Sequence, residues 1–294
     1  MCITIAANIA ETAILAYPMC FPDSIVGFIA NPVWSSELFM YYIFEFIKNV
    51  IKTAASGSAQ DNINIDYLSS VKFRIPNKTY QDKIVGVLSS LDKKILLNNL
   101  TNDNLMQMAS TVYMHHFFEC IPNGKLGSIL IEHQKSNIQV SEAQEASGNV
   151  PCFTSGDSIL KWDNALVDDR CCYLNTGGNA DVKFYVGKAA YSTDTWCISG
   201  KDQLSDYLFL LLEAIKPELD KKFFQGTGLK HLQKPLLKDR PIYIPTTDEL
   251  NAFNVQIMPM MTKISENTRE NQQLIQLRDW LLPMLMNGQA TVAD

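Results

Sequence analysis

Apolar residues recur at alternating steps of four and three over two long stretches of the chain. This spacing is the heptad pattern of helices that pack along a shared seam. The first stretch predicts a helix from about Gln81 to Phe118. In the second, Pro259 and Pro283 predict that the regular part of the helix runs only from Met260 to Leu282. The seam positions are Ile84, Leu88, Leu91, Ile95, Asn98, Asn102, Leu105, Ala109 and Val112, and then Phe253, Ile257, Met260, Ile264, Asn267, Asn271, Leu274, Arg278 and Leu281.

Asparagine occupies two seam positions near the centre of each stretch. If the two helices pair in an antiparallel way, Asn98 and Asn102 come against Asn267 and Asn271. A buried Asn at a seam gives up stability and fixes register and orientation. These four residues therefore predict a helix pair that is locked at one alignment. The alternative is that these asparagines face solvent in each helix.

The second stretch is part of a longer duplication. KILLNNLTNDNL begins at Lys94 and KISENTRENQQL begins at Lys263, an offset of 263 − 94 = 169 residues. Repeats of this length indicate duplicated domains rather than a solenoid. The offset of 169 also relates Ile75-Pro76 to Ile244-Pro245 and Ser56-Gly57-Ser58 to Gln225-Gly226-Thr227, and an offset of 171 relates Asn8 to Asn179 and Asp23-Ser24 to Asp194-Thr195.

A region of mixed character precedes each long helix. Short β-like runs at residues 2–6, 182–186 and 196–199 alternate with amphipathic helices at about 36–52 and 202–219. Met1 aligns with Cys172, so we expect the first copy to lack the counterpart of residues 126–171 and to start inside a domain. The predicted fold class is α+β, with two mixed α/β domains separated by a pair of long antiparallel coiled-coil helices. The domains are predicted at 1–76 and 121–245, and the helices at 77–120 and 246–294.

Composition narrows the class of protein. The 294 residues are 47% hydrophobic and 19% charged, which is typical of a globular protein, and neither a signal peptide nor a membrane-spanning run is evident. Seven Cys without a C-x-x-C spacing indicate reduced thiols in the cytoplasm, and no metal site is predicted. The net charge of −6 argues against general nucleic-acid binding. Locally, however, residues 216–240 hold seven Lys or Arg against three Asp or Glu, and residues 48–78 hold five against two. Such stretches are either a solvated face or a phosphate-binding surface.

The candidate chemistry is that of a binding site. The sequence contains no G-x-x-x-x-G-K-[ST] loop and no H-E-x-x-H motif, and no catalytic residue is predicted. Polar loops at equivalent places in the two copies instead supply amide, hydroxyl and cationic groups suited to phosphates and base edges. Two loops with one framework and different side chains would read two different half-sequences. The candidate contacts are Lys222, Gln225, Thr227, Lys230 and His231 in the second copy, Ser56, Ser58, Gln60 and Asn62 in the first, and Lys161, Tyr173, Asn179 and Lys183 along the same groove, with Tyr173 and Trp162 equally placed for the core.

These residues resemble the specificity subunit of type I restriction-modification systems. LRDWLLPMLMNGQ at residues 277–289 looks like the C-terminal repeat ending of that family, and IPNKTYQDKIVGVLSSLDKKI at residues 75–95 is similar to its central repeat. The resemblance covers almost the whole chain. It implies two target recognition domains that each read one half of a bipartite double-stranded DNA site, with the paired helices as a ruler for the spacer.

The resemblance also implies partners. The subunit would itself be non-catalytic and would dock modification subunits, two in number, which carry S-adenosylmethionine and methylate an adenine that is flipped out of the stack. Restriction subunits would add a requirement for ATP and Mg²⁺. The competing hypothesis is a protein-interaction scaffold, a truncated or recombined fragment that binds modification subunits or itself without reading DNA. Exposed apolar residues beside the seam would serve either role, namely Leu96, Leu97, Met106 and Met108.

Overall fold

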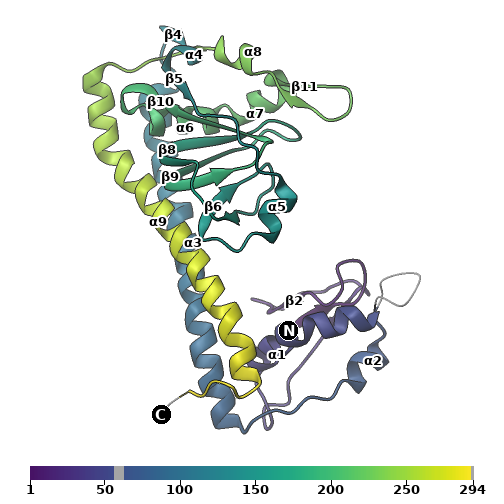
Figure 1. Ribbon diagram of the computed structural model, residues 1–294. Helices are drawn as coiled ribbons and strands as arrows, with labels where there is room; N and C mark the ends of the chain where they lie inside the picture. The colour runs from purple at the N-terminus through teal and green to yellow at the C-terminus, as the bar shows by residue number, and fades with distance from the viewer. Residues whose placement is uncertain (56–62, 293–294) are drawn as a thin grey trace. The chain divides into compact units, whose positions relative to one another are not determined.

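The computed structural model describes residues 1–55 and 63–292, which form two compact units (Figure 1). Unit 1 comprises Met1–Leu96 and Asn271–Asp294, and unit 2 comprises Leu97–Glu270. Each unit is therefore made of a globular region together with part of both long helices. This grouping differs from the predicted ranges 1–76, 77–120, 121–245 and 246–294, in which the helices stand apart from the globular regions. Those ranges stay a prediction.

The two long helices have matching lengths and matching starts. Helix α3 covers Lys78–Phe117 and helix α9 covers Thr247–Met286, which is 40 residues each. Asn77 Oδ1 accepts a hydrogen bond from the Tyr80 backbone N–H (2.9 Å) and caps α3. Before α9, the Thr246 N–H donates to Glu249 Oε2 (2.8 Å), as in a capping box. The offset of 169 relates Asn77 to Thr246, so the duplicated helices begin at equivalent residues.

Helix α9 is longer than the prolines in its sequence predict. The expected regular part, Met260 to Leu282, was too short, because α9 continues through both Pro259 and Pro283. An interior proline removes one helix hydrogen bond at a cost of about 3 kcal/mol. On either side of Pro259 the helix buries Ile257 (0% exposed) and Met261 (2% exposed). This burial offsets the loss, since a fully buried apolar side chain contributes about 1.5–3 kcal/mol.

The predicted seam is confirmed, because all eighteen of its positions are buried or half-buried. Within unit 2, Asn267 Nδ2 donates to Asn102 Oδ1 (2.8 Å), and Asn98 Nδ2 donates to Glu270 Oε2 (2.8 Å). Within unit 1, Arg278 Nη1 donates to Asp92 Oδ1 (3.0 Å). Residue numbers rise along one helix as they fall along the other, so α3 and α9 are antiparallel in both units.

Unit 2 is built on a six-stranded sheet in the order β5-β10-β8-β9-β6-β7. Neighbouring strands are antiparallel except for β6 and β9, which are parallel. The predicted strands at 182–186 and 196–199 are confirmed as parts of β9 and β10. The strands are β5 (Leu130–Glu132), β6 (Val150–Phe153), β7 (Leu160–Trp162), β8 (Val167–Asn175), β9 (Val182–Tyr191) and β10 (Thr195–Gly200).

Helix α6 (Ser205–Ala214) covers one face of this sheet, and its residues 205–212 are all buried (Figure 1). A buried ion pair joins the helix to the sheet, because Arg170 Nε and Nη2 donate to the two carboxylate oxygens of Asp206, each at 2.6 Å. Arg170 Nη1 also donates to Thr262 Oγ1 (2.9 Å) in α9. One guanidinium therefore links β8, α6 and α9, and a bidentate pair of this kind fixes geometry as well as charge.

The sheet of unit 1 repeats the centre of the unit 2 sheet. Strands β1 (Cys2–Thr4), β2 (Thr12–Ala13) and β3 (Ile25–Gly27) lie in the order β2-β1-β3, the counterpart of β9-β8-β10. Cys2 pairs with Ala13 and Gly27, and Cys172 pairs with Phe184 and Ile198. Met1 and Ile3 pack with α1 in the core of unit 1, as Cys172 and Leu174 pack with α6 in the core of unit 2, so the faces of these strands agree with the alignment of Met1 with Cys172.

The remaining elements complete the repeat. Helix α1 (Glu37–Ala55) corresponds to α6, and α2 (Ile65–Ser70) corresponds to α8 (Lys234–Lys238), both at offsets near 169. The other elements are β4 (Gly124–Lys125), α4 (Leu126–Ile129), α5 (Val140–Glu145), η1 (Lys201–Gln203), α7 (Lys216–Glu218), η2 (Leu219–Phe223), β11 (Phe224–Gln225), β12 (His231–Leu232) and β13 (Pro241–Ile242).

Candidate nucleic-acid interface

The polar loop predicted from sequence is the tip of a small hairpin. Strands β11 and β12 pair in an antiparallel way, and residues 226–230 connect them. Gly226 has φ +153°, and a Cβ at this position would lie 2.5 Å from the Leu229 carbonyl oxygen. Only glycine fits such a close approach. The turn leaves Gln225, Thr227 and His231 exposed to solvent.

This hairpin packs against the loop that follows β8. The Gly178 N–H donates to the Lys230 carbonyl (3.0 Å), and the Leu232 N–H donates to the Thr176 carbonyl (3.0 Å). Asn175 Nδ2 stabilises the same loop by donating to the carbonyl oxygens of Ser155 (3.0 Å) and Asn179 (3.2 Å). Two polar segments that are about 50 residues apart in the sequence thus lie side by side, held by backbone hydrogen bonds that do not depend on the exposed side chains.

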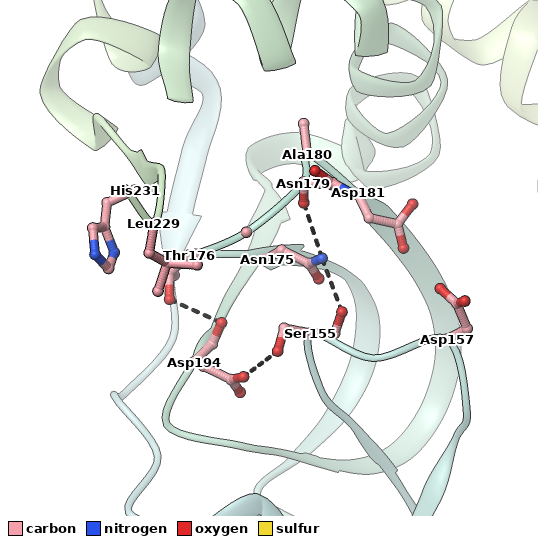
Figure 2. A pocket seen from close by; sticks show the side chains of 12 residues that line it. Ser155, Asp157, Asn175, Thr176, Asn179, Ala180, Asp181, Asp194, Leu229 and His231 are labelled. Carbon is pink, nitrogen blue, oxygen red and sulfur yellow. Dashed lines mark hydrogen bonds between the residues drawn. The ribbon is translucent and has the colours of Figure 1, made fainter. Parts of the chain in front are cut away.

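A pocket of about 540 Å³ lies between the two segments. Figure 2 shows Asn179 and His231, both predicted site residues, among the side chains that line it. Asp194 lies at one side, where it accepts hydrogen bonds from the hydroxyls of Ser155 and Ser192. Asp194 was not predicted as a site residue. The sequence signal for this position is the alignment of Asp194 with Asp23 in the duplication.

The pocket is acidic rather than basic. Asp157, Asp181 and Asp194 all line it. Burial raises the pKa of the Asp181 carboxyl, but the ammonium groups of Lys216 (2.6 Å) and Lys183 (3.2 Å) outweigh this effect and hold the pKa below its usual range. Carboxylates accept hydrogen bonds from base amino groups and repel phosphates. The interior of the pocket therefore suits a base edge, and phosphate contacts would have to come from its surroundings.

The basic stretch 216–240 is largely neutralised by nearby carboxylates. Lys230 Nζ lies 3.1 Å from Asp220 Oδ2, and Lys222 Nζ lies 3.2 Å from Glu218 Oε1. The Lys230 ammonium holds the pKa of the Asp220 carboxyl below its usual range. Five of the seven basic residues have an acidic partner, namely Lys216, Lys222, Lys230, Lys238 and Arg240. The surface of this stretch therefore carries less excess positive charge than the sequence indicated.

The other predicted contacts have different surroundings. Tyr173 is a correction to the predicted set, because it is 1% exposed and stacks on Phe153 with ring centroids 4.2 Å apart. Its aromatic ring belongs to the core and cannot meet DNA. Lys183 is 16% exposed and donates to the Thr154 carbonyl (2.9 Å), so its ammonium supports the pocket wall. Lys161 is half-buried in β7. Ser56, Ser58, Gln60 and Asn62 lie outside the described residues.

One further group was missed by sequence reasoning. His133, Cys171 and Cys197 come from three different strand regions, and their donor atoms all lie within 4.8 Å of one another. No local spacing such as C-x-x-C announces them, because neighbouring strands bring them together only in the fold. The prediction that the chain has no metal site rested on local spacing alone.

Comparisons with known proteins agree with the duplicated architecture. The family model "Type I restriction modification DNA specificity domain" matches residues 1–107 and again residues 123–278. The MjaIX type I restriction enzyme specificity subunit of Methanocaldococcus jannaschii is 23% identical, over 99% of this chain and 78% of that protein. The HindI specificity subunit of Haemophilus influenzae is 28% identical, over 42% of this chain and 27% of that protein.

A solved structure supports the fold. The type I restriction-modification S subunit of M. genitalium matches with a TM-score of 0.60 at 15% identity, over 97% of this chain and 82% of that one. Among the described residues, no helix is both long and apolar enough to cross a membrane. The duplicated α+β modules define a protein made of two related halves, and the polar loop of unit 2 is exposed as in a binding protein. The chain belongs to the type I restriction-modification DNA specificity family.

Proposed function

We propose that this chain recognises double-stranded DNA for a type I restriction-modification complex, with each unit reading one half of a bipartite site. One observation carries the proposal. The family model matches twice, and the two matched segments repeat the same order of elements, from the β2-β1-β3 sheet to helix α3 and from the β9-β8-β10 sheet to helix α9. A protein that reads two half-sequences needs two recognition modules of one framework with different loops.

In unit 2 the reading surface is the hairpin tip and the pocket beside it. Gln225, Thr227 and His231 are exposed on the hairpin, and Asn179 is exposed on the neighbouring loop. Amide and imidazole groups of this kind would contact base edges, and Lys222 and Lys230 would contact phosphates. Asp157 and Asp194 in the pocket would accept hydrogen bonds from the amino group of cytosine or adenine.

The paired helices have two roles in this proposal, because they set the spacer between half-sites and they dock the catalytic partners. Leu97, Leu100 and Met108 are 59%, 51% and 52% exposed on α3. Their spacing places them on one face of the helix, which suits an apolar contact with a modification subunit. Met106, expected to be exposed, is instead partly buried against the core of unit 2. Leu96 is 58% exposed, in unit 1.

The chemistry belongs to the partners. We infer two modification subunits that bring S-adenosylmethionine and methylate adenine, and restriction subunits that bring the requirement for ATP and Mg²⁺. The present chain is non-catalytic in this scheme and acts in the cytoplasm. Its contribution is the choice of DNA sequence.

A second candidate is a protein scaffold that binds modification subunits without reading DNA. The ion pairs that neutralise five of the seven basic residues in 216–240 favour it, since they weaken the attraction for phosphates. The two candidates differ in salt dependence. DNA binding that falls steeply with salt indicates a reader, and a stable protein complex without DNA affinity indicates a scaffold.

The experiment that tests the proposal is co-expression with a type I modification subunit from the same organism, followed by mapping of methylated adenine across the host genome. A methylated motif with two defined halves is the expected result. A motif with one defined half would mean that only one unit reads DNA. A stable complex that methylates nothing would overturn the proposal and leave the scaffold.

A further inference from the structure

His133, Cys171 and Cys197 form a cluster of metal-ligand atoms inside unit 2. His133 follows β5, Cys197 lies in β10 and Cys171 lies in β8, and these three strands are consecutive in the order β5-β10-β8. All three donor atoms lie within 4.8 Å of one another. Cys171 and Cys197 are 0% and 2% exposed, so the two sulfur atoms are held by the packed core rather than by a mobile loop.

The distances suit a tetrahedral metal ion. With Zn–S near 2.3 Å and Zn–N near 2.0–2.1 Å, neighbouring ligand atoms of a tetrahedral zinc site are about 3.5–3.8 Å apart. His133 Nε2 lies 3.4 Å from Cys171 Sγ. Small side-chain adjustments would therefore place an ion between the donors without movement of the strands. Two thiolates and an imidazole form a soft donor set, which selects Zn²⁺ over Mg²⁺ or Ca²⁺.

The cluster also borders a pocket. A pocket of about 350 Å³ is lined by His133 and Cys197, and also by Tyr191 and Gln134. It provides an entry path for an ion and room for a water molecule as a fourth ligand. Among the described residues the cluster contributes three donors. A site with three protein ligands keeps one position open, and the pocket borders two of these ligands.

We propose that unit 2 binds one Zn²⁺ ion through His133 Nε2, Cys171 Sγ and Cys197 Sγ, with the fourth position facing the pocket beside β10. Binding exchanges the thiol protons for the metal ion, so protons are released to solvent as the thiolate bonds form. The ion would tie β5, β10 and β8 together within the sheet. The proposal concerns this chain alone and does not depend on DNA binding.

The test uses the full chain without a histidine tag, freed of metal by a chelator under reducing conditions. Co²⁺ is the probe, because thiolate ligation gives a charge-transfer absorption in the near ultraviolet and tetrahedral geometry gives intense visible bands. We expect one Co²⁺ per chain, displacement by Zn²⁺, and a higher Tm with Zn²⁺. The bands should be lost in Cys171→Ala and in Cys197→Ala. They should persist in Cys152→Ala, a matched control that removes an equally buried thiol from β6 of the same unit.

Other outcomes would overturn the proposal. These are a folded wild-type chain that binds no Co²⁺, bands that survive in both cluster variants, and bands that disappear in Cys20→Ser or Cys120→Ser, which would indicate a surface thiol. If the cluster variants fail to fold, the wild-type spectrum decides, since its charge-transfer intensity reports how many thiolates bind the ion. His133→Gln removes the third ligand from a half-buried position and gives an independent check.

Discussion

At the scale of single residues, the attraction of the hairpin tip for DNA depends on whether the Lys230 ammonium is free to contact a phosphate. Its ammonium is paired with Asp220 at 3.1 Å in a largely exposed setting. We predict that Asp220→Asn strengthens DNA binding several-fold and steepens its salt dependence, because one more cation becomes available for counterion release. Lys230→Met should weaken binding about equally for all sequences and reduce the salt slope by about 1. Fluorescence anisotropy of the modification complex at several salt concentrations measures both effects.

Asp239→Asn is the matched control for this prediction. Asp239 also pairs with a lysine, Lys125 at 2.9 Å, but at the exposed junction of β4 and β13 rather than at the hairpin. This variant should leave affinity and salt slope unchanged. If Asp220→Asn and Asp239→Asn behave alike, the effect is one of net charge, and Lys230 has no special place on the DNA.

A second residue-scale prediction concerns pH and unit 1. The ammonium groups of Lys48 and Lys52 hold the pKa of the Glu11 carboxyl below the usual value of 4.5. A carboxyl whose pKa is lowered by folding stabilises the folded state above its unfolded pKa, and this contribution is lost as pH falls through the lower, folded pKa. Glu11→Gln should therefore lower Tm slightly at pH 7. Because Glu11 is 46% exposed, the effect should stay below about 1 kcal/mol.

The measurement for Glu11 is a pair of thermal denaturation series between pH 7 and pH 3. The gap between wild type and Glu11→Gln should close below about pH 4.5. A gap that persists at pH 3 would show that the carboxyl acts by packing or hydrogen bonding rather than by charge. The same series on Asp82→Asn, an exposed i,i+4 partner of Lys78, gives the baseline for a helix-surface pair.

At the scale of elements, the asparagine residues in the helix seam lead to a prediction about how polar groups there affect stability. Asn267 is 2% exposed, and its side-chain amide donates to Asn102 Oδ1. Asn102→Leu alone should cost about 1–3 kcal/mol, because it leaves a buried donor without its acceptor. Asn102→Leu combined with Asn267→Leu should cost much less, or stabilise the pair, because both polar groups are removed. Chemical denaturation of the four proteins forms a double-mutant cycle.

The control for this cycle is Asn104→Leu, an exposed position on the same helix, which should change stability by only a few tenths of a kcal/mol. Simple addition of the two single effects would mean that the hydrogen bond contributes nothing to the seam. The predicted role of Asn98, Asn102, Asn267 and Asn271 in register would then have no energetic basis.

The elements also show which parts of the fold the sequence could predict. The helices were predictable because a heptad seam is a local pattern, and the duplication doubled the signal. The length of α9 was not, because burial of Ile257 and Met261 outweighs the effect of Pro259, and burial depends on the partner helix. Tyr173 was predicted to line a DNA-facing groove or, equally, to lie in the core. Strand residues alternate between faces, and a single sequence does not say which face is covered.

The candidate site also has parts that the sequence could predict and parts that it could not. The hairpin tip was found from its glycines and polar residues, which are consecutive in the sequence. The ion pairs that neutralise the basic stretch include a long-range contact, such as Lys238 with Glu132, and no local count of charges reveals it. The cluster of His133, Cys171 and Cys197 is assembled entirely by strand pairing, so its signal exists only once the order β5-β10-β8 is known.

At the scale of the whole molecule, the duplicated helices have a function if they fix the separation of the two half-sites. We propose that one added heptad in each helix lengthens the spacer that the complex accepts. The insertions belong after Leu96 in α3 and before Asn271 in α9, where the chain passes from one unit to the other. Seven residues add about 10 Å at 1.5 Å per residue, which corresponds to about three base pairs at 3.4 Å each.

The measurement for this variant is adenine-methylation mapping with the modification subunit present. Both half-sequences should stay as in the wild type, because the reading loops are untouched, while the unread spacer grows by about three base pairs. A heptad in only one helix should abolish methylation, since the two helices would then differ in length between the units and the seam could not stay in register in both. An unchanged spacer with full activity in the double insertion would mean that the helices are not the ruler and that the partner subunits set the spacing.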